Sequence, residues 1–125
     1  MNSLLEKVER LEHEAAHFGF QWENTAQIMQ QIQSECLEVE AHLLSDDSNR
    51  AHLEEEIGDL LHAVFSLCVF CQFSPTTTLK KSLEKFERRL QSVKSIAKEQ
   101  ALDSVHGRSF SELMSLWDEA KKRVG

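Results

Sequence analysis

Apolar residues recur every three or four positions along almost the whole chain, which is the spacing of amphipathic helices that pack together. One proline and four glycines leave few helix breakers, and no alternating strand pattern interrupts the repeat. Spacings of four and three residues favour helices that cross at about 20°. We therefore predict an all-α fold, an antiparallel bundle of about five helices. The expected ranges are 3–18, 25–44, 50–72, 75–102 and a last helix that ends near residue 124.

Residue types that begin or end helices stand at these expected boundaries. A capping side chain accepts a hydrogen bond from a free backbone N–H at the helix start, and glycine readily takes the left-handed conformation that ends a helix. The predicted boundary residues are Ser3 with Glu6, Gly19, Asn24 or Thr25, Ser74 before Pro75, and Ser109 or Ser111.

Four acidic residues form two pairs on the second and third expected helices. Glu35 and Glu38 are three residues apart, as are Glu56 and Asp59, so each pair shares one helix face. A polar turn over residues 45–49 permits an antiparallel return, which would aim all four carboxylates at one place. Hard oxygen donors in this number suit Mg²⁺ or Mn²⁺. The residues alone leave two alternatives open, a metal site and a set of solvated acids.

Glu35 favours the metal-site alternative, because it occupies a position of the helix seam where an apolar residue is expected. An unpaired charge in such a seam is costly, so it needs a metal or another cation. Ile32 and Val39 flank it along the seam.

Basic and aromatic residues later in the chain are candidates for contact with an anion. Lys85 and Arg89 lie four residues apart on one helix flank, where they are either solvated or form a phosphate clamp. Trp117 suits a helix core, and Lys121, one turn on, has the reach to contact an anion. In the linker before the second helix, the Phe20 and Trp22 pair either plugs the end of the bundle or walls a base pocket.

Two short motifs have a plain structural explanation beside a chemical one. Residues 13–17 match H-E-x-x-H, which holds zinc in some proteases but arises by chance in polar helices. We interpret both histidines as solvated. Cys68 and Cys71 form a C-x-x-C inside an apolar run and are expected to pack as small hydrophobic residues, the alternative being a redox or metal pair.

The amino-acid composition limits which binding partners and which cellular location are expected. The net charge of −7 argues against non-specific nucleic-acid binding, which needs a basic surface. No apolar run approaches the roughly 18 residues of a membrane span, and the first residues lack the pattern of a signal peptide. With 125 residues and three cysteines, we expect one cytoplasmic domain that makes no disulfide framework and contacts no membrane.

In the order and spacing of its motifs the chain resembles the MazG-type nucleoside triphosphate pyrophosphohydrolases, within the all-α NTP pyrophosphatase group. The family hallmark is E-E-x-x-E on one helix and E-x-x-D on the next. The resemblance covers roughly residues 19–121, and the chain looks more like the C-terminal copy of MazG proteins that carry two such domains. The matching stretches are residues 34–38, 56–59, 19–23, 85–89 and 116–121.

The resemblance implies the role of each candidate residue. Glu35, Glu38, Glu56 and Asp59 would hold Mg²⁺, with Mn²⁺ as an alternative, and form the catalytic centre for conversion of NTP and water into NMP and pyrophosphate. The residues implied to contact the triphosphate or line the nucleotide site are Lys85, Arg89, Trp117 and Lys121. Family members assemble as dimers or higher oligomers, so the resemblance implies a homodimer.

Two positions depart from the family pattern. Ser34 stands where the family usually has its first glutamate, and Leu83 where an asparagine often precedes the Lys-Phe pair. Ser34 keeps open a second hypothesis, a catalytically weak or inactive helical module that binds nucleotide or a protein partner. A third hypothesis is a purely structural helical dimer with solvated acids.

Overall fold

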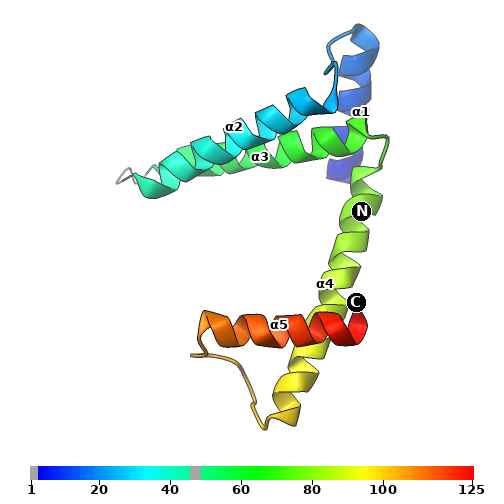
Figure 1. Cartoon of the computed structure of the whole chain (residues 1–125). Helices are drawn as coiled ribbons and strands as arrows, with labels where there is room; N and C mark the ends of the chain where they lie inside the picture. Colours follow the sequence, from blue (N-terminus) through cyan, green and yellow to red (C-terminus); the bar gives the residue numbers. More distant parts are fainter. Residues whose placement is uncertain (1–2, 46–48) are drawn as a thin grey trace. The chain divides into compact units, whose positions relative to one another are not determined.

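The fold is all-α, with five helices in the described part of the chain. A computed structural model describes residues 3–45 and 49–125, so part of the expected turn over residues 45–49 and the side chain of the predicted cap Ser3 lie outside it. The helices are α1 (Ser3–Phe18), α2 (Thr25–Leu44), α3 (Arg50–Phe70), α4 (Pro75–Glu99) and α5 (Phe110–Val124) (Figure 1). No single described helix is both long and apolar enough to cross a membrane, and α3 with α4 meets that test only as a broken pair.

The chain forms two compact units that join within α4. The first extends to Thr78, and the second comprises Leu79–Gly125. The single domain expected from the sequence therefore stays a prediction.

Helices α2 and α3 lie side by side and antiparallel in the first unit, as the sequence predicts (Figure 1). Helix α1 contacts α3 as well. The buried side chains of this unit are few and small, so the packed contact between the helices is narrow. They are Ile28, Ala63, Ser66, Val69 and Pro75.

Side-chain caps fix where four of the helices begin, and before α3 the Oδ1 of Asn49 accepts a hydrogen bond of 3.1 Å from the N–H of His52. Before α2, the Oδ1 of Asn24 accepts a hydrogen bond of 3.0 Å from the N–H of Gln27. Before α4, the Oγ of Ser74 accepts one of 3.2 Å from the N–H of Thr77. Ser109 caps α5. These caps confirm Asn24, Ser74 and Ser109 as boundary residues, with Asn24 in preference to Thr25 and Ser109 in preference to Ser111.

Left-handed residues end four of the described helices, α1, α3, α4 and α5, and two of these residues are not glycine. Gly19 ends α1 with φ +99°, as predicted. Helices α3 and α4 end earlier than predicted, before Gln72 (φ +68°) and Ala101 (φ +60°). In each case two backbone hydrogen bonds close a Schellman motif, including 2.9 Å from Leu102 N–H to Ala97 O. The predicted ends were wrong because neither residue signals this conformation in a sequence.

We expect Ala101→Gly to stabilise the protein by about 1 kcal/mol, because an L residue in the left-handed region costs about 1–2 kcal/mol that glycine avoids. Urea unfolding of the variant and the wild type measures the difference. A loss of stability would contradict this explanation of where α4 ends.

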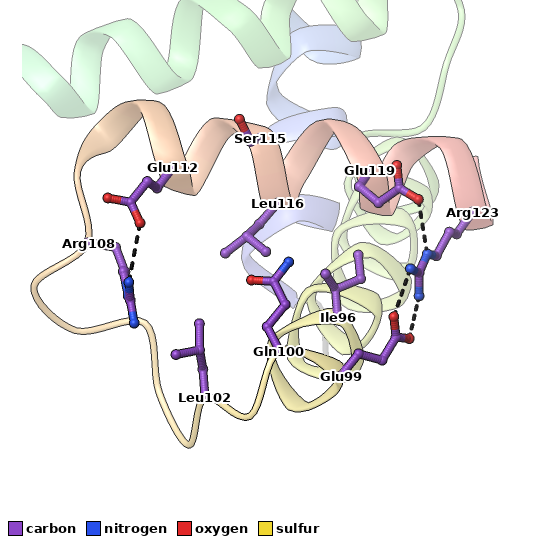
Figure 2. Close-up of a pocket in the computed structure, with 10 residues that line it drawn as sticks. All are labelled: Ile96, Glu99, Gln100, Leu102, Arg108, Glu112, Ser115, Leu116, Glu119 and Arg123. Atoms are coloured by element: carbon purple, nitrogen blue, oxygen red, sulfur yellow. Dashed lines mark hydrogen bonds and ion pairs between the residues drawn. The ribbon is translucent and has the colours of Figure 1, made fainter.

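In the second unit, α4 and α5 pack around a small apolar cluster. Ile96, Leu116 and Ala120 are buried, with Val93 and Val105 packed against them. At its edge, the Arg123 guanidinium donates two hydrogen bonds of 2.6 and 2.9 Å to the Glu99 carboxylate (Figure 2). The adjoining cavity has a volume of about 460 Å³. Both guanidinium groups that line this cavity are paired, that of Arg123 with Glu99 and that of Arg108 with Glu112 at 3.5 Å, so neither is free for a ligand.

The start of α5 carries a capping box that makes stability depend on pH. Ser109 and Glu112 each bond the other's backbone N–H, and the bonds from Ser109, followed by the nearby charge of Arg108, lower the pKa of Glu112. A lowered pKa means that the stabilisation is present above the ordinary carboxyl pKa and is lost as pH falls through the lowered one. We expect Ser109→Ala to cost about 1 kcal/mol near neutral pH and less at about pH 3. Urea unfolding at the two pH values checks this, and an equal cost at both would contradict the coupling.

Candidate metal and nucleotide site

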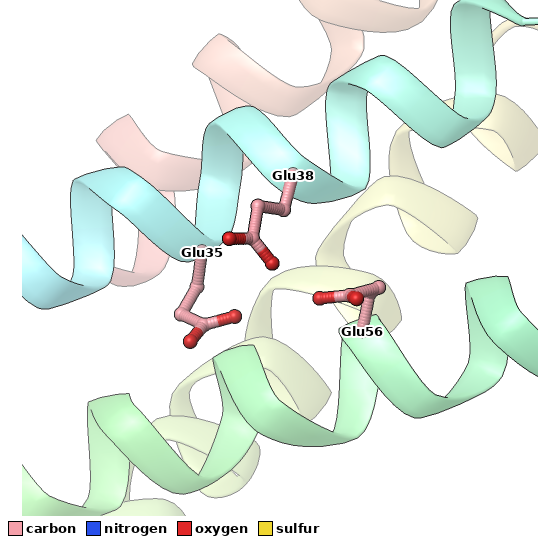
Figure 3. A group of neighbouring side chains, drawn as sticks. All are labelled: Glu35, Glu38 and Glu56. Atoms are coloured by element: carbon pink, nitrogen blue, oxygen red, sulfur yellow. The ribbon is translucent and has the colours of Figure 1, made fainter.

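Three of the four predicted acids converge between α2 and α3. The side chains of Glu35 and Glu38 project from α2 toward that of Glu56 on α3 (Figure 3). One carboxylate oxygen from each lies within 4.8 Å of the others, a spacing that one ion can bridge. The i, i+3 spacing on α2 and the antiparallel return produce this arrangement, and the role as metal ligands stays a prediction.

The electrostatics of the three-acid group favour a bound cation. A side-chain hydrogen bond with Glu38 raises the pKa of Glu56 above its ordinary value, and so do partial burial and the charges of Glu38, Glu35 and Asp59. The Oε2 atoms of Glu35 and Glu56 are buried and lack a hydrogen-bond partner in the described structure. Ionised carboxylates only accept hydrogen bonds, so they cannot satisfy one another. These orphaned oxygens fit a divalent cation, which would supply what each lacks.

One further side chain contacts the three-acid group, and the fourth predicted acid lies outside it. Gln31, one turn before Glu35, donates a hydrogen bond of 2.7 Å from Nε2 to Glu35 Oε1. The fourth predicted acid, Asp59, is exposed and lies outside the closest group, although its charge acts on Glu56. Gln31 was missed in the sequence, where its spacing of four residues from Glu35 was the available signal.

Two histidines at the turn end of the hairpin were also missed. His42 Nε2 on α2 lies 4.0 Å from Glu56 Oε1, and its ring meets that of His52 on α3 edge-on at 5.3 Å between centroids. The signal was again spacing, because His42 follows Glu38 by four residues and His52 precedes Glu56 by four.

The predicted triphosphate-binding residues all lie in the second unit. The Arg89 guanidinium lies over the Trp117 ring, with its Cζ 5.5 Å from the ring centroid, and Phe86 packs against the same ring. Lys121 pairs with Asp118 at 3.6 Å, and Lys85 is exposed. The structure thus brings Arg89 and Trp117 together, while the contact of all four residues with nucleotide stays a prediction.

A larger groove lies in the first unit, between α1, the following linker and α3. Its volume is about 750 Å³, and Phe20 and Trp22 are among its walls. At one side the Glu12 Oε1 accepts a hydrogen bond of 2.6 Å from Ser66 Oγ and lies 2.7 Å from His62 Nε2. The aromatic pair therefore lines a groove, which favours the base-pocket alternative over a simple plug.

The histidines and cysteines of the two short motifs lie outside the three-acid group. His13 and His17 are exposed, and the described residues gather only Glu35, Glu38 and Glu56 into a possible metal group. Cys68 is half-buried, but Cys71 is exposed at the end of α3 rather than packed, so the expectation was wrong for Cys71. Both thiols are free.

Comparison with known proteins identifies the family. The family model of the MazG nucleotide pyrophosphohydrolase domain matches residues 23–94, which is more than half of the chain. The chain belongs to the MazG family. The match includes the linker after Trp22, the whole α2–α3 hairpin with its four acids, and Lys85 and Arg89 on α4.

Relatives of known name extend the similarity. The chain is 28% identical over 119 residues to the nucleoside triphosphate pyrophosphohydrolase of Escherichia coli K12, covering 95% of this chain and 45% of the relative. It is 26% identical over 117 residues to the nucleoside triphosphate pyrophosphohydrolase/pyrophosphatase MazG of Thermotoga maritima, covering 94% and 44%. The chain thus spans less than half the length of these relatives. The activity of the whole relatives is therefore only proposed for this MazG-family chain.

Proposed function

We propose that this chain is a Mg²⁺-dependent nucleoside triphosphate pyrophosphohydrolase that converts NTP and water into NMP and pyrophosphate. The observation that carries the proposal is the three-acid group, in which two buried carboxylate oxygens lack any hydrogen-bond donor. Membership of the MazG family and relatives named for this reaction support the same activity.

The acids would hold the metal and prepare the water. Glu35, Glu38 and Glu56 would bind Mg²⁺, with Asp59 beside them and Mn²⁺ as an alternative ion. The bound ion would neutralise phosphate charge and lower the pKa of a coordinated water. A carboxylate oxygen that is not committed to the ion would accept a proton from the attacking water and orient it.

The basic residues would act on the phosphates. Lys85 and Arg89 would contact the triphosphate and stabilise the charge that develops on the transferring group. Trp117 and Lys121 would complete the nucleotide site. Trp117 already supports the Arg89 guanidinium by stacking against it.

We place the base in the groove of the first unit. Asp59, His62 and Ser66 follow one another at spacings of three and four residues, so they share one side of α3. Ser66 is therefore about 10 Å along the helix from Asp59 at 1.5 Å per residue. A nucleoside separates its phosphates from its base by one sugar, so a nucleotide with phosphates at the acids would present its base to this groove.

A homodimer is part of the proposal. Helix α1 exposes Leu4, Leu11 and Phe18 at intervals of seven residues, and their exposed fractions are 74%, 48% and 88%. A regular apolar row on one helix face suits a helix of a second copy. We further propose a cytoplasmic location, and no nucleic-acid partner.

Pyrophosphate and NMP release from a panel of NTPs and dNTPs, with Mg²⁺ and with EDTA, tests the activity. Metal-dependent release of both products in equal amounts is the expected result. A folded protein that releases neither product, yet gains thermal stability from Mg²⁺ and nucleotide, would support the inactive binding module instead. Ser34→Glu is then the variant to measure for restored hydrolysis.

A further inference from the structure

A carboxylate with one unused oxygen lies on the wall of the groove between α1 and α3. Glu12 lines this groove, and its Oε1 accepts a hydrogen bond of 2.6 Å from Ser66 Oγ and lies 2.7 Å from His62 Nε2. An ionised carboxylate has about four lone-pair sites, two on each oxygen. Both neighbours contact Oε1, so among the described residues Oε2 has no partner and keeps its capacity to accept hydrogen bonds.

The two contacts also fix which oxygen is available. Ser66 is only 5% exposed, so its hydroxyl holds Oε1 from the buried side of α3. The His62 side chain is 64% exposed and contacts the same oxygen from the solvent side, while the Glu12 side chain is 20% exposed. Because Oε1 is held against α3 in this way, Oε2 is the oxygen that a molecule in the groove can contact.

The same groove has aromatic walls that suit a nucleobase. Phe20 and Trp22 line it, and Phe20 is 80% exposed. Every base has a flat π face that stacks on an aromatic side chain, so stacking binds all bases with little discrimination. The groove volume of about 750 Å³ lies within the range of small-molecule sites. Aromatic walls therefore explain why a base would bind, and selection among bases has to come from a polar group such as Glu12.

The free oxygen distinguishes bases by the group that they present to it. Cytosine and adenine carry exocyclic amino groups, which donate hydrogen bonds, and a glutamate side chain accepts from N4 of cytosine. Uracil and hypoxanthine carry a carbonyl oxygen at the corresponding position. Two acceptors that face each other make no hydrogen bond, and a site built around a hydrogen bond rejects the analogue that lacks it.

We infer that Glu12 Oε2 selects nucleotides whose base carries an exocyclic amino group over those that carry a carbonyl there, CTP over UTP and ATP over ITP. The selection rests on the proposed function, because it concerns the base of the nucleotide that the acids would hydrolyse. Within each pair the two nucleotides have the same sugar, phosphates and ring size, so stacking and metal binding are the same for both.

A purely structural role of Glu12 predicts a different result. If the carboxylate only joins α1 to α3 through Ser66 and His62, its replacement changes stability and leaves the ratio of the two substrates unchanged. If Oε2 contacts the base, the ratio changes in a direction that the replacement determines.

The first experiment compares kcat/KM for CTP and UTP, and for ATP and ITP, in the wild type with Mg²⁺. We expect the amino-bearing nucleotide of each pair to be preferred at least about tenfold, the size of one good contact to a base edge. This comparison needs no variant to fold. Equal kcat/KM within the pairs, or a preference for UTP and ITP, would overturn the inference.

Glu12→Gln tests the residue itself. Ser66 donates to Oε1, so the amide oxygen of glutamine takes that place and its NH₂ group takes the place of Oε2. An NH₂ group donates to the carbonyl of uracil, so the preference for CTP should fall to about one or reverse. Glu14→Gln is the matched control, because Glu14 is exposed on the same helix and does not line the groove. A ratio in Glu12→Gln equal to that of the wild type would overturn the inference.

A binding measurement separates the failure of this selection from the failure of the proposed function. Calorimetric titration with the α,β-methylene analogues of CTP and UTP needs no hydrolysis. Tighter binding of the CTP analogue without hydrolysis of any nucleotide would support the selection and contradict the proposed reaction. Hydrolysis of CTP and UTP at equal rates, with equal binding of the analogues, would contradict the selection alone. Neither binding nor hydrolysis would overturn both.

Discussion

Replacing Glu56 by glutamine is expected to abolish metal-dependent pyrophosphate release and, at the same time, to raise the melting temperature of the metal-free protein. Glu56 is the acid whose pKa is raised by a side-chain hydrogen bond with Glu38, by partial burial and by the surrounding negative charges. Glutamine keeps the size of the side chain, removes one of the repelling charges, and supplies N–H donors for neighbouring carboxylate oxygens. The same change removes a ligand, so catalysis should fall by more than about a hundredfold.

In Glu56→Gln the stability of the metal-free protein should rise while catalysis falls. These opposite effects distinguish a metal site from a structural one. Thermal melting with Mg²⁺ and with EDTA measures stability, and pyrophosphate release measures catalysis. An ion that binds only the folded state raises the melting temperature of the wild type, and this increase should disappear in Glu56→Gln. Glu54→Gln is the matched control, because it is the same change at an exposed position of the same helix. A variant that is less stable without metal, or that keeps the Mg²⁺ effect, would show that Glu56 is not a ligand.

The convergence of the acids could be predicted from the sequence because it depends on local rules. Spacings of three residues put each pair on one face, and a short polar turn allows only an antiparallel return. Glu35 could be singled out because a charge in an apolar seam is costly unless it is paired. The observed group of Glu35, Glu38 and Glu56 follows from these two facts.

Helix starts were predictable, and helix ends were less so, for a physical reason. A start needs a side-chain oxygen, which only a few residue types provide, so Asn24 and Ser109 are visible in the sequence. An end needs one residue in the left-handed region, and Gln72 or Ala101 can adopt it when backbone hydrogen bonds compensate. Among the residues that end α1, α3 and α4, only Gly19 is of a type that predicts the left-handed conformation.

The cluster of Glu12, His62 and Ser66 could not be found by spacing. Glu12 on α1 precedes His62 by 50 residues and Ser66 by 54, and both of these lie on α3. Which face of α1 meets α3 depends on packing between the helices, and α1 has apolar residues on a broad arc. His42 was different, because its spacing from Glu38 was visible. The family hallmark consists of acids alone, so it gave no reason to include a histidine at this spacing.

Arg89→Ala is expected to lower kcat/KM for nucleoside triphosphates by about a thousandfold, the lower end of what an arginine supplies in phosphoryl transfer. The guanidinium has a fixed orientation, since it stacks on Trp117 and its Nε donates a hydrogen bond of 2.9 Å to the Gly125 carbonyl. A planar group held in this way presents its remaining donors in one plane, which matches two phosphate oxygens at once. Lysine has no such fork, so Arg89→Lys should restore little of the activity.

The structural role of Arg89 predicts a different result. Loss of its contact with Trp117 costs about 0.5–1 kcal/mol of stability, which a thermal melt detects, but this loss alone leaves turnover of the folded protein intact. Arg88→Ala is the matched control, because Arg88 is the adjacent, exposed arginine on the same helix. A variant at Arg89 that melts slightly earlier yet turns over at the wild-type rate would remove Arg89 from the nucleotide site. A variant that melts normally and loses turnover would show that the guanidinium acts on the phosphates, because its packing role is then too small to explain the loss.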